Sequence, residues 1–249
     1  MDMWKFYSIR EKRHVYCNPL NRERFEAFLK QLQLEPNSTV LDIACGKGEF
    51  LVKLSELYRI KGVGVDISPY FIQEARKKAR LRVPDAPLDF IEIDGKNYKP
   101  QDGKLFDLSS CIGATWIWNG YKGTLKALKD MTKPGGLLLV GEPFWLKEPD
   151  PEYLRAESLQ KEEYTGSHQD NVRLGEACGL SCIYALASTK EDFDHYEMLG
   201  WWSLEDYVRQ NSNDPDIQEI LALYRKGKEN YLRWGRETMG WATYLFRKP

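Results

Sequence analysis

Three aspartates and two glycines have the types and the spacing of a small-ligand site. Asp42 lies in a short apolar run that breaks at Gly46 and Gly48, and Asp66 and Asp94 each end a later apolar run. Glycine lacks Cβ, so such a turn can adopt positive φ angles, and a ligand can lie against its backbone beside the free N–H groups of the following helix. The pattern predicts a pocket for a nucleotide-like ligand, although a strand-to-helix turn without a ligand has the same local signature.

The elements around this turn alternate between two periodicities. Continuously apolar strands are predicted over 39–44, 62–66, 88–93, 106–111 and 137–141. Helical spacing of apolar residues is found before them, from residue 21, and between them, over 48–58, 70–81 and 121–131. Buried strands that alternate with helices are typical of a parallel sheet covered on both faces. Residues 142–145 are expected to leave the fifth strand.

In the second half of the sequence, two more strands are predicted, over 181–187 and 241–246, with helical and capping signals between them. We interpret this intervening segment as an inserted helical cap within a single domain. The predicted domain begins with an N-terminal arm and helix (1–38) and a cofactor-binding core (39–141). A segment of helices and strand six (142–189), the cap (190–240) and the last strand (241–249) follow.

Composition excludes several classes of protein. The formal net charge is -1, which gives no overall field to attract a polyanion, and the basic run at 76–82 is typical of a solvated helix end. No apolar run approaches the roughly 20 residues that span a bilayer, so we expect no membrane partner and a cytoplasmic location. Five cysteines without zinc-type spacing predict reduced thiols and no metal site.

The position of Asp66 reduces the number of ligand classes that the pocket could bind. It ends the second strand 20 residues after Gly46, where a carboxylate can accept hydrogen bonds from both hydroxyls of a ribose. A nicotinamide dinucleotide would use the same acid, but Leu51 stands where its fingerprint needs a third glycine. Asp94 and Gly95 can border an adenine, or form an ordinary Asp-Gly turn.

The core resembles the class I S-adenosylmethionine (SAM) dependent methyltransferases. Four segments match this family in order. They are the glycine motif (41–48), the second-strand acid (65–68), the adenine-side segment (93–95) and the turn before strand five (133–136). Shorter strings at 111–116, 141–145 and 239–241 are similar to a bacterial and archaeal group of small-molecule methyltransferases of unassigned substrate. The resemblance implies an α/β, Rossmann-like sheet of seven strands, mostly parallel, with helices on both faces and an antiparallel last strand between the fifth and the sixth.

The resemblance also implies roles for individual residues. Gly46 and Gly48 would let the methionine moiety approach, Asp42 would hold that end, and Asp66 would bind the ribose. The remaining cofactor contacts would come from residues beside these motifs and at the end of strand four, namely Ala44, Cys45, Ile67, Asp94, Gly95 and Cys111. Cys45 stands where the family often has Gly or Ser. The product would be S-adenosylhomocysteine (SAH).

The sequence says less about the methyl acceptor than about the methyl donor. A sulfonium methyl is already activated, so a base is needed only where the acceptor must lose a proton. Glu142 is the candidate base, or else it caps a helix or pairs with an arginine. Substrate contacts are predicted for residues in the arm, the cap and the strand ends, namely His14, Trp116, Trp145 and Tyr196, with Trp118, Trp201 and Trp202 nearby.

The predicted function is methyl transfer to a small amine, thiol or carboxylate held under the cap. A non-catalytic SAM-binding sensor or partner subunit is the alternative, and an RNA or protein methyltransferase is less favoured because no extended basic face is predicted.

Overall fold

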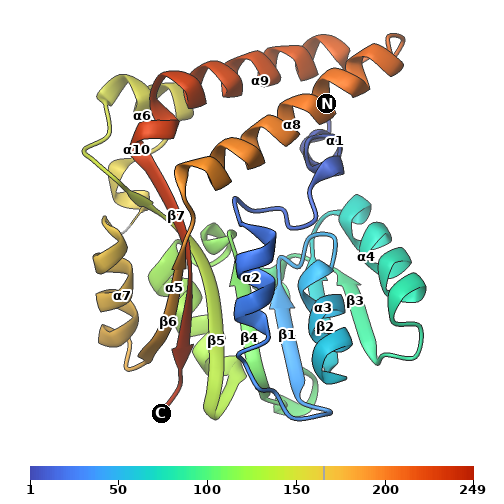
Figure 1. Ribbon diagram of the computed structural model, residues 1–249, viewed down its shortest axis with the longest axis vertical. Coiled ribbons are helices and arrows are strands. Elements are labelled where there is room, and N and C mark those ends of the chain that lie inside the picture. Colours follow the sequence, from blue (N-terminus) through green and yellow to red (C-terminus); the bar gives the residue numbers. More distant parts are fainter. Residues whose placement is uncertain (165) are drawn as a thin grey trace.

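A seven-stranded sheet forms the centre of the molecule (Figure 1). The computed structural model describes residues 1–164 and 166–249. In the order in which they lie side by side, the strands are β3 (Leu88–Glu92), β2 (Lys61–Asp66), β1 (Thr39–Ile43), β4 (Phe106–Ile112), β5 (Thr132–Trp145), β7 (Met239–Arg247) and β6 (Ser181–Ala187).

The strand directions confirm the predicted fold class. β1 pairs in parallel with both β2 and β4, and β4 pairs in parallel with β5. β7 runs antiparallel to β5 and β6 and lies between them. The carboxyl ends of β1, β2 and β4 therefore meet at one edge, where α/β sheets of this kind bind ligands.

Helices cover both faces of the sheet. One face packs against α2 (Arg22–Leu29), α3 (Glu49–Tyr58) and α4 (Pro69–Arg82), whose apolar residues join those of β1 in one core. The opposite face packs against α5 (Tyr121–Met131) and α7 (His168–Ala177), with Leu138, Val140 and Phe144 of β5 in a second core. Burial on both faces explains why the central strands β1 and β5 contain continuous apolar runs.

β5 is longer than predicted. Residues 142–145 were expected to leave the sheet, but they remain in β5 because β7 continues to pair with them as far as Trp145 and Met239. This correction keeps Glu142 inside the sheet, opposite Ala242.

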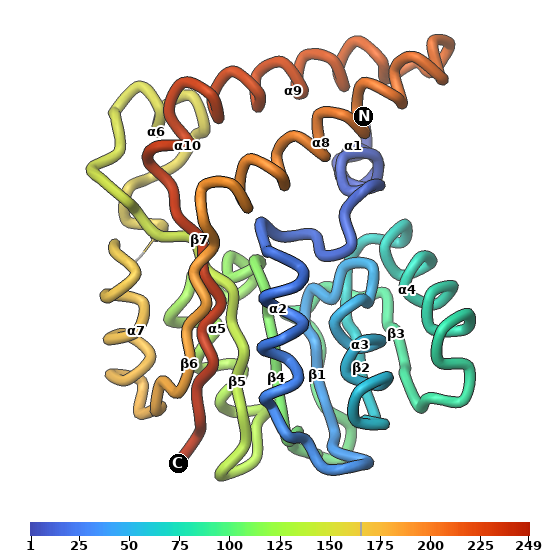
Figure 2. Tube along the Cα trace, in the orientation of Figure 1, coloured from blue at the N-terminus to red at the C-terminus, as the bar shows by residue number. Residues whose placement is uncertain are grey.

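A helical layer lies over the carboxyl ends of the strands (Figures 1 and 2). It consists of α8 (Lys190–Gln210) and α9 (Ile217–Asn230), against which the N-terminal α1 (Met3–Arg10) packs. Phe6, Ile9, Leu204 and Ile220 form its small apolar core. The N-terminal arm is thus joined to the cap, although the two are about 190 residues apart in sequence.

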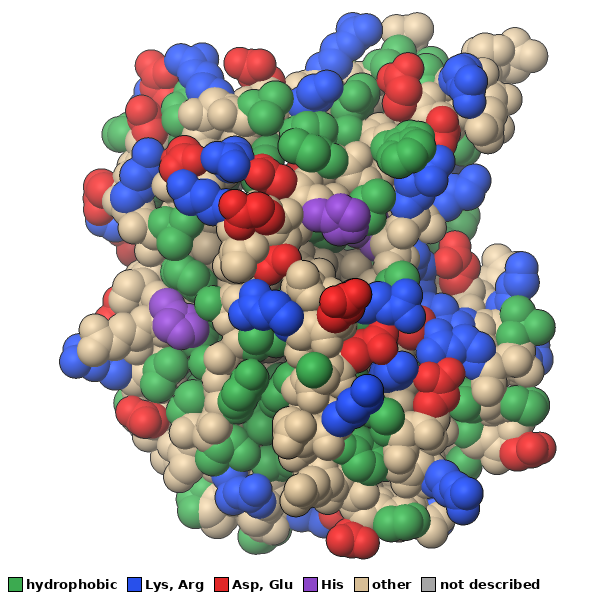
Figure 3. Space-filling model, viewed as in Figure 1, with side chains coloured by type: hydrophobic (Ala, Val, Ile, Leu, Met, Phe, Trp, Pro, Cys, Tyr) green, Lys and Arg blue, Asp and Glu red, His purple; other side chains and the backbone are tan. Residues whose placement is uncertain are grey.

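Shorter elements complete the chain. They are η1 (Glu11–Arg13), η2 (Gly95–Asn97), η3 (Gln101–Gly103), η4 (Thr115–Trp118), α6 (Pro151–Glu157), η5 (Lys161–Glu163), the π-helical η6 (Tyr231–Gly235) and α10 (Arg236–Thr238). None of the described helices is both long and apolar enough to cross a membrane. Acidic and basic side chains are interspersed on the face shown in Figure 3, in keeping with the net charge of -1.

Candidate active site

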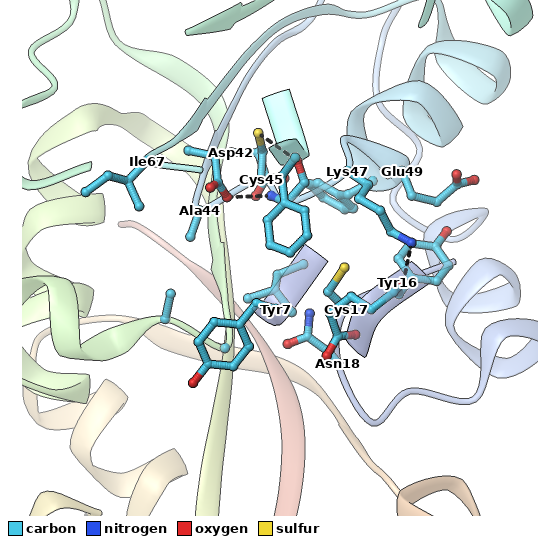
Figure 4. A pocket seen from close by; sticks show the side chains of 18 of the residues that line it. Tyr7, Tyr16, Cys17, Asn18, Asp42, Ala44, Cys45, Lys47, Glu49 and Ile67 are labelled. Atoms are coloured by element: carbon cyan, nitrogen blue, oxygen red, sulfur yellow. Dashed lines mark hydrogen bonds between the residues drawn. The ribbon is translucent and has the colours of Figure 1, made fainter. Parts of the chain in front are cut away.

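A cavity of about 610 Å³ opens where the carboxyl ends of β1, β2 and β4 meet the arm and α8. Figure 4 shows side chains from the glycine turn and from the arm facing each other across it. Many of the predicted site residues line this cavity: Asp42, Ala44, Cys45, Gly46, Asp66, Ile67, Asp94, Gly95, Trp116 and Tyr196. Its volume lies within the range of small-molecule sites.

The glycine turn has the backbone conformation that its sequence predicts. Gly46 and Gly48 have φ angles of 51° and 70°, and Ala44 also has a positive φ of 57°. A Cβ on Gly46 would have only Cys17 within 4 Å, whereas a Cβ on Gly48 would lie 2.7 Å from the Phe90 ring. Gly46 therefore borders the cavity, while Gly48 is outside its wall and serves the packing of the turn against the sheet.

The carboxylate of Asp66 is oriented by the backbone. Its two oxygens accept hydrogen bonds from the N–H groups of Gly46 and Ser68, both at 2.8 Å. A carboxylate has about four lone-pair positions, so it retains acceptor capacity for two hydroxyl groups. Burial raises the pKa of Asp66, and the backbone N–H groups of Ser68, Gly46 and Ile67 oppose that rise.

Asp42 is a buried carboxyl group beside Asp66. Its Oδ1 accepts a hydrogen bond from Ser110 Oγ at 2.7 Å. Burial raises the pKa of Asp42 to about 7, the Ser110 hydroxyl opposes the shift, and the charge of Asp66 adds to it. The thiols of Cys45 and Cys111 are also buried, and burial raises their pKa values, so they act as small apolar side chains. Cys111 lies below the cavity wall, among the apolar residues under α5.

The arm closes the other side of the cavity, and one lysine attaches it. Lys47, inside the glycine turn, donates hydrogen bonds from Nζ to the carbonyl oxygens of Glu11, at 2.6 Å, and of His14. Asn18 lies over Gly113 at the end of β4, where its Oδ1 would be 2.2 Å from a Cβ. Sequence reasoning missed most of the arm residues that line the cavity, because no motif marks them: Trp4, Tyr7, Glu11, Tyr16, Cys17 and Asn18.

A polar cluster joins the arm to α8 at the cavity wall. Glu11 Oε1 accepts hydrogen bonds from Arg10 and, at 3.0 Å, from the Tyr196 hydroxyl. His14, the predicted substrate contact, lies behind the wall with its ring centroid 4.6 Å from that of Tyr196. Its Nε2 is 2.8 Å from the Tyr196 carbonyl oxygen, and its Nδ1 is 3.1 Å from Glu11 Oε2.

Glu142 is not placed to act as the predicted base. Its side chain is completely buried between the sheet and α5, outside the cavity wall. Neither carboxyl oxygen makes a well-formed hydrogen bond to the described residues. Burial raises its pKa to about 8, opposed only by Thr115, so the group holds its proton at neutral pH. A buried, protonated carboxyl cannot accept a proton from a substrate in the cavity.

Most of the tryptophans predicted near the mouth are used in packing instead. The Trp145 indole N–H donates to the Lys161 carbonyl oxygen at 3.0 Å, away from the cavity. Trp118 packs into the core under α5, and Trp201 packs edge-on against Tyr231. Trp202 is covered by the guanidinium of Arg13. Among the predicted tryptophans, Trp116 alone lines the cavity, and its side chain is 69% exposed at the rim.

Comparisons with known proteins agree with this fold. Residues 40–136 match the family described as a methyltransferase domain. The uncharacterized protein YjhP of Escherichia coli is 27% identical over 98% of both chains, and its crystal structure superposes with a TM-score of 0.90 over 98% of this chain and 100% of that one.

Two further solved structures cover all or nearly all of the chain. A SAM-dependent methyltransferase from Geobacter sulfurreducens, in complex with SAH, is 26% identical with a TM-score of 0.90, covering 98% of each chain. One from Thiobacillus denitrificans, also in complex with SAH, is 27% identical with a TM-score of 0.89, covering 100% of each. The fold, the methyltransferase domain at 40–136 and these similarities identify the protein as an enzyme that uses SAM to transfer a methyl group.

Proposed function

We propose that this enzyme transfers the methyl group of SAM to a small molecule held between the glycine turn and the N-terminal arm. The observation that carries the proposal is one cavity of about 610 Å³, which has the cofactor-type residues of β1 and β2 on one wall and arm and cap residues on the other. Donor and acceptor would share this space. The whole chain, arm and cap included, acts as one domain in this proposal.

The residues of the first wall fit the cofactor. Asp66 retains acceptor capacity for the ribose hydroxyls, and Gly46 leaves room for the methionine end. Ile67 is 43% exposed beside Asp94 and Gly95, and offers an apolar surface to an adenine ring. When bound, SAM supplies an electrophilic methyl group; the chain's own residues hold the acceptor in line with it and exclude water.

The second wall supports a small acceptor. It is formed by aromatic side chains of the arm and the strand ends, Trp4, Tyr7 and Trp116, and by Tyr196 of α8. Trp4 and Tyr7 come from α1, so α1 and α8 both cover this side of the cavity. A net charge of -1 and interspersed surface charges also disfavour a nucleic acid.

The test is methyl transfer from SAM carrying a radiolabelled methyl group, with a panel of small amines, thiols and carboxylates in one arm and bulk RNA and protein in the other. Label in small-molecule products supports the proposal. Label found only in RNA or protein contradicts it, and SAM binding without transfer to any acceptor would indicate the sensor alternative.

A further inference from the structure

The lining of the cavity changes from polar and buried to apolar and exposed. Asp42 and Lys47 line it as buried side chains, whereas Tyr7 and Trp116 line it and are 41% and 69% exposed. Figure 4 shows the Tyr7 ring well separated from the Lys47 side chain. Exposed apolar residues that are scattered singly need no explanation, but these two belong to the wall of one cavity. The mouth of the cavity is therefore apolar, and its depth is polar.

The helix α1 has two apolar faces, and only one of them is used in packing. Phe6 and Ile9 are buried in the small core of the cap. Met3 and Tyr7, four residues apart, lie together on another face, and both are exposed. A helix that is apolar all round is ordinarily buried on every side. The second face of α1 therefore has apolar surface to spare, and through Tyr7 it borders the mouth of the cavity.

The apolar surface continues from α1 to the core side of the mouth. The helix α4 packs against α1, and its first turn presents Tyr70 to solvent next to Phe71, which lines the cavity. On η4, Trp116 extends the same kind of surface. Ile67 is left out here because the proposed adenine position covers it. We call the remaining exposed apolar residues the mouth patch: Met3, Tyr7, Tyr70 and Trp116.

The charges of α1 disfavour a charged occupant of the mouth patch. Lys5 is bound to Asp214 and Asp216 at 2.7 Å each. Arg10 is paired with Glu11. An anionic headgroup at the mouth would thus find no free cation on this helix. The mouth patch offers apolar contact, which is matched by hydrocarbon.

We propose, resting on the function proposed above, that the methyl acceptor is an amphiphile. Its polar reacting group lies in the cavity beside the donor, and a hydrocarbon chain extends from that group over the mouth patch. Continuity supports this occupant, because Tyr7 and Trp116 belong both to the cavity wall and to the mouth patch. The chain takes no part in the reaction, but its binding holds the reacting group in line with the methyl carbon.

Calorimetry with probes of increasing chain length tests the hydrocarbon site. The probes are butan-1-ol, hexan-1-ol and octan-1-ol, and the corresponding n-alkylamines, titrated into protein saturated with SAH and into protein alone. Full transfer of one CH₂ group out of water changes an affinity about fourfold, so we expect a gain of about twofold to fourfold per CH₂. Affinity that is independent of chain length in both series would overturn the proposal. If SAH fails to bind but the chain-length dependence persists in protein alone, the donor site falls and the mouth patch remains.

Variants of the mouth patch locate the chain. In Trp116→Ser and Tyr7→Ser the gain per CH₂ should fall to nearly one, with SAH affinity unchanged. Trp116→Phe keeps an apolar ring and should retain the gain. Leu81→Ser, at an exposed position near the end of α4, is the control. An unaltered gain in both serine variants would overturn the proposal, and so would a tenfold loss of SAH affinity with an unaltered gain, which would assign the mouth patch to the adenine.

Two other occupants are tested with the same variants. The protein is sedimented with phosphatidylcholine vesicles, and its size is measured by analytical ultracentrifugation in their absence. We expect no cosedimentation, and the same size for the wild type and Trp116→Ser. Vesicle binding that is lost in Trp116→Ser would assign the mouth patch to a bilayer. Self-association that is lost in this variant would assign it to a second copy of the chain, and either result would contradict the proposal.

Discussion

The ammonium group of Lys47 donates a hydrogen bond of 2.6 Å to the carbonyl oxygen of Glu11. This contact joins the glycine turn, which borders the cofactor side of the cavity, to the arm, which borders the acceptor side. A lysine within a glycine-rich turn would ordinarily be expected to face a phosphate or solvent. Here its charge is used to fix the position of the N-terminal arm.

Lys47→Met should release the arm. The variant loses two charge-assisted hydrogen bonds while keeping a side chain of similar length, so we expect a loss of about 2 kcal/mol in the free energy of unfolding. Hydrogen exchange of the amides in 9–18 should accelerate, since the arm would open without global unfolding. Lys12→Met, at an exposed position of the arm, is the matched control. Protection of the arm that equals the wild type would show that Lys47 does not hold it.

Asp66→Ala should weaken both SAM and SAH. The variant removes the acceptor assigned to the ribose, together with the carboxylate that fixes the N–H groups of Gly46 and Ser68. Hydrogen bonds to a charged group contribute about 1.5–3 kcal/mol each, so the affinity measured by calorimetry should fall at least tenfold. Asp85→Ala, in an exposed loop, should leave it unchanged. An unchanged affinity in Asp66→Ala would show that the ribose assignment is wrong.

Two glycine substitutions separate backbone strain from steric overlap. Gly48 and Gly103 have similar φ angles of 70° and 64°, but a Cβ on Gly103 meets nothing within 4 Å. Gly103→Ala should therefore cost only the left-handed strain, about 1 kcal/mol. Gly48→Ala should cost a further 1–3 kcal/mol or so, because its Cβ would overlap Phe90 and Ala75. Urea denaturation measures both, and equal losses would refute the packing role of Gly48.

Glu142 should make the protein less stable as the pH rises. Its pKa is about 8 in the folded protein and about 4.5 in the unfolded chain, so between these values the folded state binds more protons and the free energy of unfolding falls with increasing pH. Glu142→Gln removes this titration. At pH 8 the variant should be more stable than the wild type by roughly 2–4 kcal/mol, with a smaller difference at pH 5.

The pH series needs a surface control. Glu162→Gln, at an exposed position, should leave the pH dependence of stability unaltered. If Glu142→Gln loses stability equally at pH 5 and pH 8, the carboxylate is charged and paired in the folded protein, contrary to the structure.

The cofactor half of the site was predictable because its signals are local. Gly46 and Gly48 mark a backbone conformation that other residues rarely adopt, and Asp66 lies at a fixed distance from them along one strand, turn, helix and strand. The sheet was predictable for the same reason, since its central strands, such as β1 and β5, contain runs of apolar residues. The ends of β5 were not, because its extension to Trp145 depends on pairing with β7, almost 100 residues later.

The acceptor half was harder to predict because it is assembled from distant segments. Nothing near Glu11 or His14 indicates that residue 47 and residue 196 will contact them. Aromatic residues were a poor guide, since the same side chain can line a cavity, as Trp116 does, or fill a core, as Trp118 does. Glu142 was misassigned because its position after an apolar run suggests the edge of the sheet, whereas β7 and α5 enclose it.

The central claim is that the cavity beside Gly46 and Asp66 binds the methyl donor. Calorimetric titration of the full-length protein with SAM and with SAH tests it most directly. The account predicts that each binds at a single site and that each excludes the other in competition. Absence of binding by both would contradict it.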